Sequence, residues 1–495
     1  MKIKLTRLLL VTLAAALGAC STSSQPMRKL PQGSKFLRPG EKPAVSAAES
    51  CFIEGRADGK APYSCSFVEF DERGDFMNFA QHKDCAERLD TLAKGGKKLV
   101  VIMYCHGWQN NSQSGDVVEF NDFLSLIAAN ASKAGQDVRV HGIYLGWRGN
   151  IVMPFVTKDD RYRSVTANFG EAIVDSRNHR LTSLGGIVPE SLSYWNRLNA
   201  AENHVSGLPF ARAAFTYAAA AKRYGAKPGN KVFAIGHSMG ALMIEQSLGQ
   251  AMVGATIQQW YEHPAAQSRA LPFDMILLVN SAAPAIHAKQ MRDFLRADRS
   301  ARIHSSDKAP LLVSLTSTAD GATTYLHGVA QILSPLNPTL QRSYTTGVFG
   351  DRPKGTATYP EHRPIPQSQF YTKTPGHHPY LLNHQIVRVD AANIDPNLTA
   401  AEALRRNLDF SAKNPEVFVT SKTSQPAAAW RIRNYPEESL PTVDGKKPSM
   451  RDSNYWIIEC GKEIIGSHND VWNPAAMETY AAIFRLAESR RHSIK

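Results

Sequence analysis

The sequence predicts an α/β fold with a mostly parallel central sheet and helices on both of its faces. Short apolar runs rich in Val, Ile and Leu recur along the chain, and helical stretches separate them. This alternation is typical of parallel strands joined by crossover helices. The hydrophobic content of 43% and the charged content of 20% suit a globular protein with a sizeable core.

The runs expected as strands have the length of buried strands and are too short for typical helices. They are residues 66–69, 99–105, 138–145, 231–235, 275–279, 311–315 and 455–459. The stretches expected as helices are residues 79–93, 121–133, 209–224, 241–260, 287–296 and 474–490. Residues 149–205 lack a regular pattern and are expected to be irregular.

The N-terminus has the pattern of an export signal. Basic residues precede an apolar run at residues 8–17, which is too short to span a bilayer permanently. The run ends in a Leu-Gly-Ala-Cys box at Cys20, which resembles the box of bacterial lipoprotein signals. The resemblance implies that residues 1–19 are removed, that Cys20 carries fatty acyl chains such as palmitate, and that Ser21 favours an outer-membrane location facing the periplasm. An ordinary signal peptide cut near Ala19 is the alternative.

The mature chain divides into a spacer and a domain. Residues 20–48 are rich in Ser, Pro, Lys and Gly and lack periodicity, so we expect a flexible tether. Residues 49–495 are expected to form one domain with insertions near 149–205 and 321–454. No later apolar run approaches 18 residues, so a soluble body is expected.

The charge and the cysteines restrict the partners. The formal net charge is +13, of which Lys2, Lys4 and Arg7 belong to the signal. No nucleic-acid partner is expected, because no basic block or binding module accompanies the charge; anionic lipid or cell-wall polymer fits better. The cysteine spacing suggests no metal site. The cysteines after Cys20 are Cys51, Cys65, Cys85, Cys105 and Cys460.

An odd number of cysteines leaves at least one thiol unpaired unless another chain pairs with it. Cys105 and Cys460 end strand-like runs and are expected to be buried free thiols. The three N-terminal cysteines allow one bridge, most simply Cys51–Cys65, and the sequence leaves the choice between bridge and free thiols open.

One motif indicates nucleophilic catalysis. Gly236-His237-Ser238-Met239-Gly240 stands between an apolar strand and a helix, where a G-x-S-x-G motif forms a sharp turn that exposes the serine oxygen. Side chains at 236 and 240 would collide with the neighbouring strand and helix. The Met239 amide, at the start of the helix, would then face the oxyanion that develops during attack.

The motif and its context resemble the α/β-hydrolase superfamily, in which Gly-His-Ser-Met-Gly is common among lipases and esterases. The likeness covers about residues 66–320 and 455–490. It implies an α/β-hydrolase fold with lid-like insertions, a serine nucleophile at Ser238, and no cofactor or metal. The superfamily takes a second oxyanion donor from the loop after its third strand. Here that loop begins with His106-Gly107-Trp108, so the resemblance implies the Trp108 amide as the second donor. His106 itself is expected to be structural.

The resemblance also implies the chain order serine, acid, histidine. Asp320 follows the apolar run at 311–315 and a short polar exit, which is where the superfamily places the acid. Asp307 precedes that run, and Asp293 and Asp298 lie on or near the preceding helix, so they would face the wrong edge. Asp320 is therefore the expected acid.

The base should follow the last strand and precede the final helix. Only His468, in a Gly-Ser-His-Asn-Asp loop, meets this condition. His377, His378 and His384 fall in the long excursion between acid and base. We expect that excursion and residues 149–205 to cover the site or shape the substrate pocket.

These features predict an envelope-anchored serine hydrolase. Ser238, His468 and Asp320 would form the triad, and the amides of Met239 and Trp108 would form the oxyanion hole. A small-molecule or lipid carboxylic ester is the expected substrate. The alternatives are an amide or thioester hydrolase and a non-catalytic binding protein of the cell envelope on a hydrolase scaffold.

Overall fold

The computed structural model describes residues 26–30, 50–57, 61–133, 137–149, 194–224, 229–255, 272–297, 310–328, 331, 343–345, 364–378, 381–389, 394–408, 414, 416–421, 427–434 and 454–489. The expected signal peptide, Cys20 and most of the expected tether lie outside these residues.

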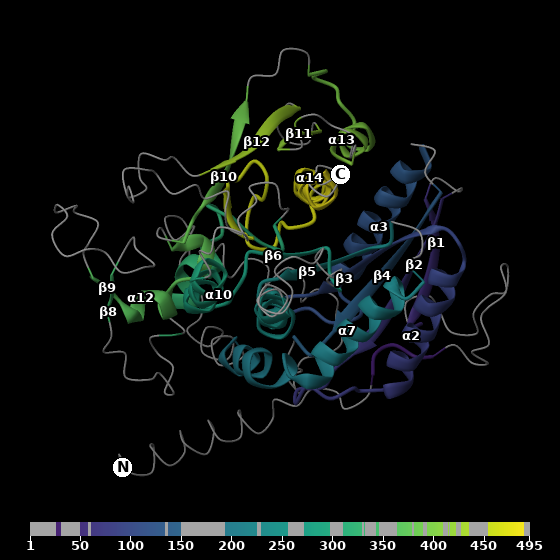
Figure 1. Ribbon diagram of the computed structural model, residues 1–495, viewed down its shortest axis with the longest axis horizontal. Coiled ribbons are helices and arrows are strands. Elements are labelled where there is room, and N and C mark those ends of the chain that lie inside the picture. Colours follow the sequence, from purple (N-terminus) through teal and green to yellow (C-terminus); the bar gives the residue numbers. More distant parts are fainter. Residues whose placement is uncertain are drawn as a thin grey trace, which may run out of the picture.

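Among the residues that the structure describes, the core is a sheet of 11 strands in the order β1-β2-β4-β3-β5-β6-β7-β13-β10-β12-β11 (Figure 1). Neighbouring strands run parallel from β2 through to β10, and only β1, β12 and β11 pair antiparallel. The predicted α/β class with a mostly parallel sheet is confirmed. The strands are β1 (Phe52–Ala57), β2 (Ala61–Glu69), β3 (Lys98–Cys105), β4 (Val138–Gly146), β5 (Lys231–His237), β6 (Met275–Val279), β7 (Leu312–Ser317), β10 (His384–Val389), β11 (Val417–Thr420), β12 (Ala428–Asn434) and β13 (Tyr455–Cys460).

Helices cover both faces of the sheet, as expected (Figure 1). Each face has its own apolar core. The first face is covered by α2 (Phe79–Lys94), α7 (Leu208–Lys222), α8 (Met239–Ile244) and α10 (Ala285–Ala297). The opposite face is covered by α3 (Gly115–Lys133) and α14 (Pro474–Ser489), and α13 (Ala400–Asn407) packs against both. Parallel strands buried on two sides explain the nearly continuous apolar runs in the sequence.

Several element boundaries differ from the sequence-based expectation. Helix α3 begins at Gly115 rather than at 121, because Val117 and Phe120 already bury their side chains against the sheet. The helix expected at 241–260 begins at Met239 and passes into a π-helix, η2 (Glu245–Gly249). The expectation that 149–205 is irregular is wrong for 194–205, which is helical and ends in the π-helix η1 (Ala201–Val205).

The expected insertion at 321–454 contributes to the core sheet. Strand β10 pairs parallel with β13, and His384 of β10 stands opposite Ile458 of β13. Strands β12 and β11 extend this edge of the sheet by antiparallel pairing. Strands β10, β12 and β11 of this excursion therefore lengthen the sheet, a contribution that the expected covering or pocket-shaping role did not include. A separate part comprises β8 (Ser343–Thr345), β9 (Pro364–Pro366), α12 (Gln367–Thr372) and the 3-10 helix η5 (Pro375–His377).

The N-terminal region also departs from the expectation. Residues 26–30 fall in the expected flexible tether, yet they lie against the domain, and Arg28 is buried. The suggested Cys51–Cys65 bridge is not formed. The Cys51 carbonyl accepts from the Phe67 amide while Cys65 stands opposite Ile53, so the two thiols are offset along the ladder. All five described cysteines are buried free thiols, as expected for Cys105 and Cys460.

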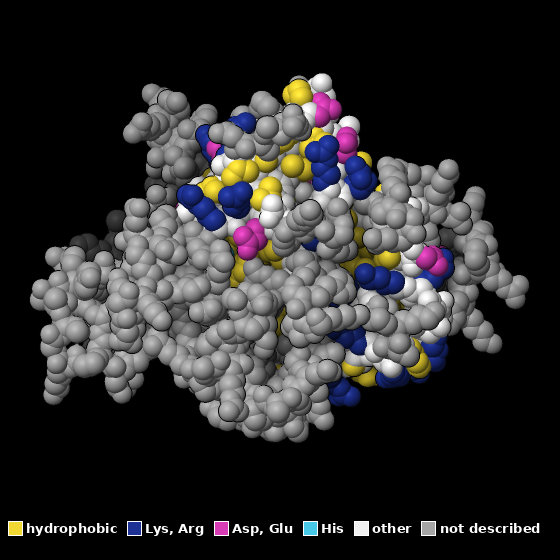
Figure 2. Space-filling view, turned by 45° about the horizontal axis from the view of Figure 1, so that its top comes forward, with side chains coloured by type: hydrophobic (Ala, Val, Ile, Leu, Met, Phe, Trp, Pro, Cys, Tyr) yellow, Lys and Arg dark blue, Asp and Glu magenta, His cyan; other side chains and the backbone are white. Residues whose placement is uncertain are grey.

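The described surface is mixed in charge. Figure 2 shows Lys and Arg side chains scattered among hydrophobic and acidic ones on one face, without a single contiguous basic block. Among the described residues, no helix is both long enough and apolar enough to cross a membrane.

Candidate active site

Ser238 lies on a sharp turn between strand β5 and helix α8. Its backbone has φ 55° and ψ −119°, a strained conformation that costs a non-glycine residue about 1–3 kcal/mol. The Ser238 amide donates to the Val279 carbonyl at 3.0 Å, and the Ser238 carbonyl accepts from the Ala282 amide at 3.1 Å. The neighbouring strand end therefore holds the turn in its strained form.

The two glycines of the motif are required by close packing. A Cβ atom at Gly240 would lie 2.3 Å from the Cys105 carbonyl oxygen, and one at Gly236 would lie 2.6 Å from the Ala241 Cα atom. Both distances are far below van der Waals contact. The expected collisions with the neighbouring strand and helix are confirmed, and they explain why both flanking positions are glycine.

His468 connects the serine to the acid. The Ser238 hydroxyl donates to His468 Nε2 at 2.9 Å, and His468 Nδ1 donates to Asp320 Oδ1 at 2.9 Å. The three residues are separated by up to 230 positions in the sequence. The structure thus brings Ser238, His468 and Asp320 together in the order expected from the sequence, and the carboxylate on Nδ1 favours the tautomer that leaves Nε2 free to accept a proton.

Asp320 is fully buried between β7 and the π-helix η3 (Ala322–Leu326). Its Oδ1 atom accepts from the Thr323 amide at 3.0 Å, and its Oδ2 atom accepts from the Thr323 hydroxyl. Burial alone would raise the pKa of Asp320, but attraction to His468 and the hydrogen bonds from His468 and Thr323 outweigh it and lower the pKa to about 2. The carboxylate therefore stays ionised at neutral pH.

The other histidines considered as bases lie elsewhere. His377 Nε2 is 3.0 Å from two threonine hydroxyls of η3, so it lies behind the acid rather than beside the serine. The His378 ring stacks on Phe370 at 4.2 Å, and the His384 ring stacks on Trp456 at 4.0 Å. The Ser238 hydroxyl bonds to His468 instead.

The carbonyl group of His468 has two donors that the sequence analysis missed. His237 Nε2 donates to it at 2.9 Å, and Asn280 Nδ2 donates to it at 3.2 Å. Asn280 is itself fixed, because its Oδ1 atom accepts from the Ser317 amide at 3.0 Å. Burial, followed by the positive field of His468, lowers the pKa of His237 to about 3, so His237 is neutral and keeps its proton for this bond.

Asn280, whose side chain holds the His468 carbonyl, has a positive φ of 44°. Asparagine tolerates such a backbone conformation better than most residues. The only sequence signal for His237 was its place inside the serine motif, where the side chain type is not specified. These two side chains hold the loop that carries the histidine.

The loop after β3 approaches the serine from the other side. A Cβ atom at Gly107 would lie 2.9 Å from the Ser238 Cβ atom, so only glycine allows this approach. Trp108 follows in the chain, and Met239 is the first residue of helix α8. Amides in the first turn of a helix lack intrahelical acceptors. The roles of Met239 and Trp108 as oxyanion donors remain predictions that this proximity favours.

His106 holds this loop, as the sequence analysis expected. Its Nδ1 atom donates to the Gly107 carbonyl at 2.9 Å, its Nε2 atom accepts from the Trp147 amide at 3.1 Å, and its ring is fully buried. Burial lowers the pKa of His106 to about 4. A neutral imidazole with both nitrogens engaged has no free nitrogen with which to act as a base.

Aromatic side chains from the 194–205 segment pack over the loop. The Trp108 ring meets the Tyr194 ring edge-on, with centroids 5.2 Å apart. Tyr194 is buried, and its pKa is raised by burial and further by the negative charge of Asp320. The described end of the first expected insertion thus borders the triad.

The remaining expectations fall on other parts of the chain. Asp298, Asp307 and Cys20 lie outside the described residues, and Asp293 lies on helix α10. Within the ranges that the structure describes, no group of His, Cys, Asp and Glu side chains has the arrangement of a metal site.

Comparisons with protein-family models, curated proteins and solved structures found no match for this chain.

Proposed function

We propose that this protein is a serine hydrolase that cleaves carboxylic esters through an acyl-enzyme. The observation that carries the proposal is the continuous hydrogen-bonded chain from Ser238 through His468 to Asp320, with 2.9 Å at each step. A serine on a strained turn, a histidine hydrogen-bonded to it and a buried carboxylate are the parts that activate a weak hydroxyl nucleophile.

The proposed reaction has two steps. Ser238 Oγ forms a bond to the ester carbonyl carbon while His468 Nε2 takes the hydroxyl proton, and the same proton then passes to the departing alkoxide. Water next attacks the acyl-enzyme, with His468 again taking a proton and returning it to Ser238 as the acid product leaves. Asp320 orients the ring and stabilises the imidazolium that forms in each step.

The tetrahedral oxyanion would be stabilised by the amides of Met239 and Trp108. The turn from Ser238 into α8 and the close approach of Gly107 to Ser238 support these two donors. Preorganised amides of this kind supply about 2.7–4 kcal/mol of transition-state stabilisation each.

The order of the strands supports an α/β-hydrolase fold within the coarser α/β class. The serine follows β5, the acid follows the second strand after it, β7, and the histidine follows the last parallel strand of the central region, β13. Esters are proposed ahead of amides and thioesters because the Gly-His-Ser-Met-Gly motif resembles lipases and esterases. Small-molecule or lipid esters are the proposed substrates.

The proposal includes a location in the bacterial cell envelope. The Leu-Gly-Ala-Cys box at Cys20 supports a lipid anchor, and Ser21 supports an outer-membrane location facing the periplasm. Several acyl chains on one residue give stable anchoring, at about 0.8 kcal/mol per buried CH₂ group. Replacement of Cys20 by serine should release the protein from membranes or leave it as an unprocessed precursor.

Labelling with a fluorophosphonate probe, together with hydrolysis of p-nitrophenyl esters, tests the catalytic proposal. The wild-type protein should be labelled, and Ser238→Ala should abolish labelling and hydrolysis with a nearly unchanged thermal midpoint. Ser247→Ala is the matched control: Ser247 is also buried and lies in the helical segment after Ser238, but its hydroxyl donates to the Met243 carbonyl. Labelling that persists in Ser238→Ala would remove this serine from its role.

A further inference from the structure

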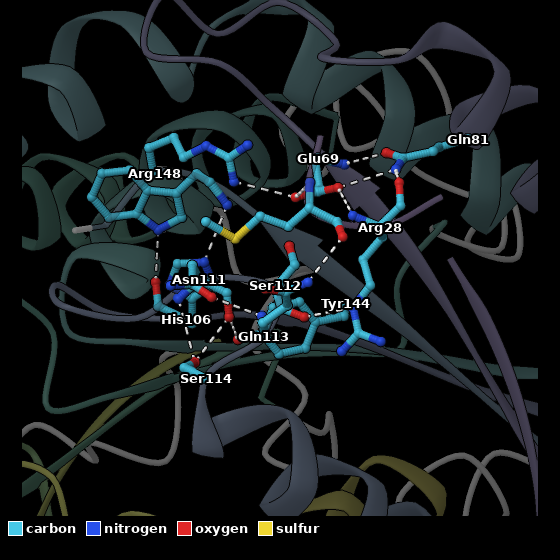
Figure 3. Close-up of polar contacts among 12 residues, drawn as sticks. Arg28, Glu69, Gln81, His106, Asn111, Ser112, Gln113, Ser114, Tyr144 and Arg148 are labelled. Atoms are coloured by element: carbon cyan, nitrogen blue, oxygen red, sulfur yellow. Dashed lines mark hydrogen bonds and ion pairs between the residues drawn. The ribbon is translucent and has the colours of Figure 1, made fainter. Parts of the chain in front are cut away.

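The first described residues form a buried polar network with the loop that begins at His106 (Figure 3). The amides of Met27 and Arg28 donate to the two carboxylate oxygens of Glu69, at 3.1 and 2.9 Å. The Arg28 carbonyl accepts from Gln81 Nε2 at 2.8 Å. Residues 26–30, hereafter the N-terminal segment, are therefore bound to β2 and α2 through both backbone donors and acceptors.

The Arg28 side chain extends from this segment to the loop. Its Nε atom donates to the Ser112 carbonyl at 2.6 Å, and its guanidinium group lies over the Phe67 ring at 4.0 Å. In the opposite direction, the side chain of Gln113 on the loop donates to the Met27 carbonyl of the N-terminal segment at 3.0 Å. Arg28 is only 2% exposed, so its hydrogen bonds are shielded from competing water.

A second connection runs through Glu69, the last residue of β2. Besides the two backbone amides, its carboxylate accepts from Arg148 at 3.3 Å, and both side chains are almost fully buried. Arg148 directly follows Trp147, whose amide and indole donate to His106 Nε2 and the His106 carbonyl, at 3.1 and 2.9 Å. The same carboxylate thus ties the N-terminal segment to the residue that precedes Gly107 and Trp108.

The loop is therefore held near both of its ends. His106 is fixed by Trp147, and Ser112 is fixed by Arg28, while Trp108 lies between them. Gln109, with φ 68°, adds a strained position whose amide donates to the Gly149 carbonyl at 3.0 Å. A loop with strained backbone keeps its form only where surrounding contacts over-determine it.

We propose that the N-terminal segment is a positioning element of the active site, in which Arg28 fixes the 106–114 loop in the form that holds the Trp108 amide beside Ser238. The inference rests on the proposed function, because it gives the loop a role in binding the oxyanion. Arg28 touches no reacting atom and acts through the Ser112 carbonyl. Residues 26–30, which fall in the expected tether, are then part of the catalytic domain.

The test uses Arg28→Ala in the full chain, with Lys29→Ala as the matched control. Lys29 is the neighbouring cation, and its side chain is exposed. We expect Arg28→Ala to lower kcat per titrated serine about 10- to 100-fold, as a displacement near 1 Å in an active site can do. KM should stay within about twofold, because the substrate ground state does not need the oxyanion donor. Lys29→Ala should retain wild-type kcat, and Arg28→Lys should fall between the two.

Titration of active serines with the fluorophosphonate separates positioning from folding. A purely structural role would lower the number of reactive serines and the thermal midpoint, but would leave kcat per reactive serine unchanged. Equal values for Arg28→Ala and Lys29→Ala would overturn the inference. Gln113→Ala removes the exposed contact on the loop side and should cause a smaller loss of kcat, so a fold defect in Arg28→Ala does not block the test.

Amide hydrogen exchange gives a readout that does not depend on activity. Arg28→Ala should accelerate exchange in residues 106–114 and leave residues 231–244 unchanged, whereas Lys29→Ala should change neither. Unchanged exchange in the loop would also contradict the inference. An unlabelled wild-type protein would instead contradict the proposed function, so the two failures are distinguishable.

Discussion

The Ser238 turn and the His468 loop meet at one hydrogen bond, but they are held in different ways. The turn is fixed by close packing at Gly236 and Gly240, which lie two residues on either side of the serine, and Gly240 packs on the Cys105 carbonyl of strand β3. The loop is fixed through its carbonyl group by His237 and Asn280, which are 231 and 188 positions away. Steric constraint that only glycine satisfies leaves a readable motif in a sequence, whereas long-range hydrogen bonds do not.

The largest expected effect comes from the acid that orients the loop histidine. Asp320→Asn should lower kcat about 10⁴-fold, because an amide that donates to Nδ1 favours the wrong histidine tautomer. Steady-state hydrolysis of a p-nitrophenyl ester, normalised to folded protein, measures the loss. Thr323→Val, which removes only the hydroxyl on Oδ2, is the control and should retain most of the activity.

Asp320 also predicts how the stability of the fold depends on pH. The pKa of Asp320 is lowered to about 2 in the folded protein, below the ordinary value of 3.8. Its ionised form therefore stabilises the fold fully above about pH 4, and this stabilisation is lost as pH falls from about 4 to about 2. The thermal midpoint of Asp320→Asn should lie below that of wild type at pH 6, and the difference should narrow at pH 3. A constant difference would contradict the assigned environment.

A substitution in the turn tests whether steric constraint dominates there. Gly240→Ala would place a Cβ atom 2.3 Å from the Cys105 carbonyl and 2.4 Å from the His106 carbonyl, so the turn or strand β3 must shift. We expect a loss of about 3 kcal/mol in unfolding free energy, together with a fall in kcat. Gly254→Ala is the control, since no atom lies within 4 Å of its added Cβ. Chemical denaturation of both variants measures the contrast, and equal stabilities would contradict it.

The smallest expected effect concerns the hydrogen bonds that hold the His468 carbonyl. His237→Leu removes the donor at 2.9 Å and should lower kcat about 10-fold with little change in KM, since the base is loosened rather than lost. His237→Gln offers an amide donor at similar reach and should recover most of the rate. If leucine and glutamine variants have the same kcat, His237 acts by packing and the contrast between turn and loop fails.

Much of the fold was predictable because buried parallel strands are apolar throughout. The runs at 99–105, 231–235 and 275–279 each became a strand of the central sheet. Residues 384–389 were not predicted as a strand, because their exposure alternates and their place beside β13 depends on a partner about 70 positions away.

The candidate site likewise contains residues that could be predicted from the sequence and residues that could not. Ser238, Asp320 and His468 could be predicted because each follows a recognisable strand, and parallel strands bring their carboxyl ends to one edge. The supporting residues could not. Asn280 and Arg28 act through hydrogen bonds to distant backbone carbonyls, and such bonds impose no periodicity or motif on the sequence.

The binding of residues 26–30 to the domain changes the geometry of the proposed anchor. Only residues 21–25 separate Cys20 from the N-terminal segment, where the sequence alone suggested a linker reaching to 48. Six fully extended steps from Cys20 to Pro26 span roughly 20 Å. A lipid on the proposed anchor Cys20 would therefore hold residues 26–30, and the end of strand β2 to which they bind, within roughly that distance of the bilayer.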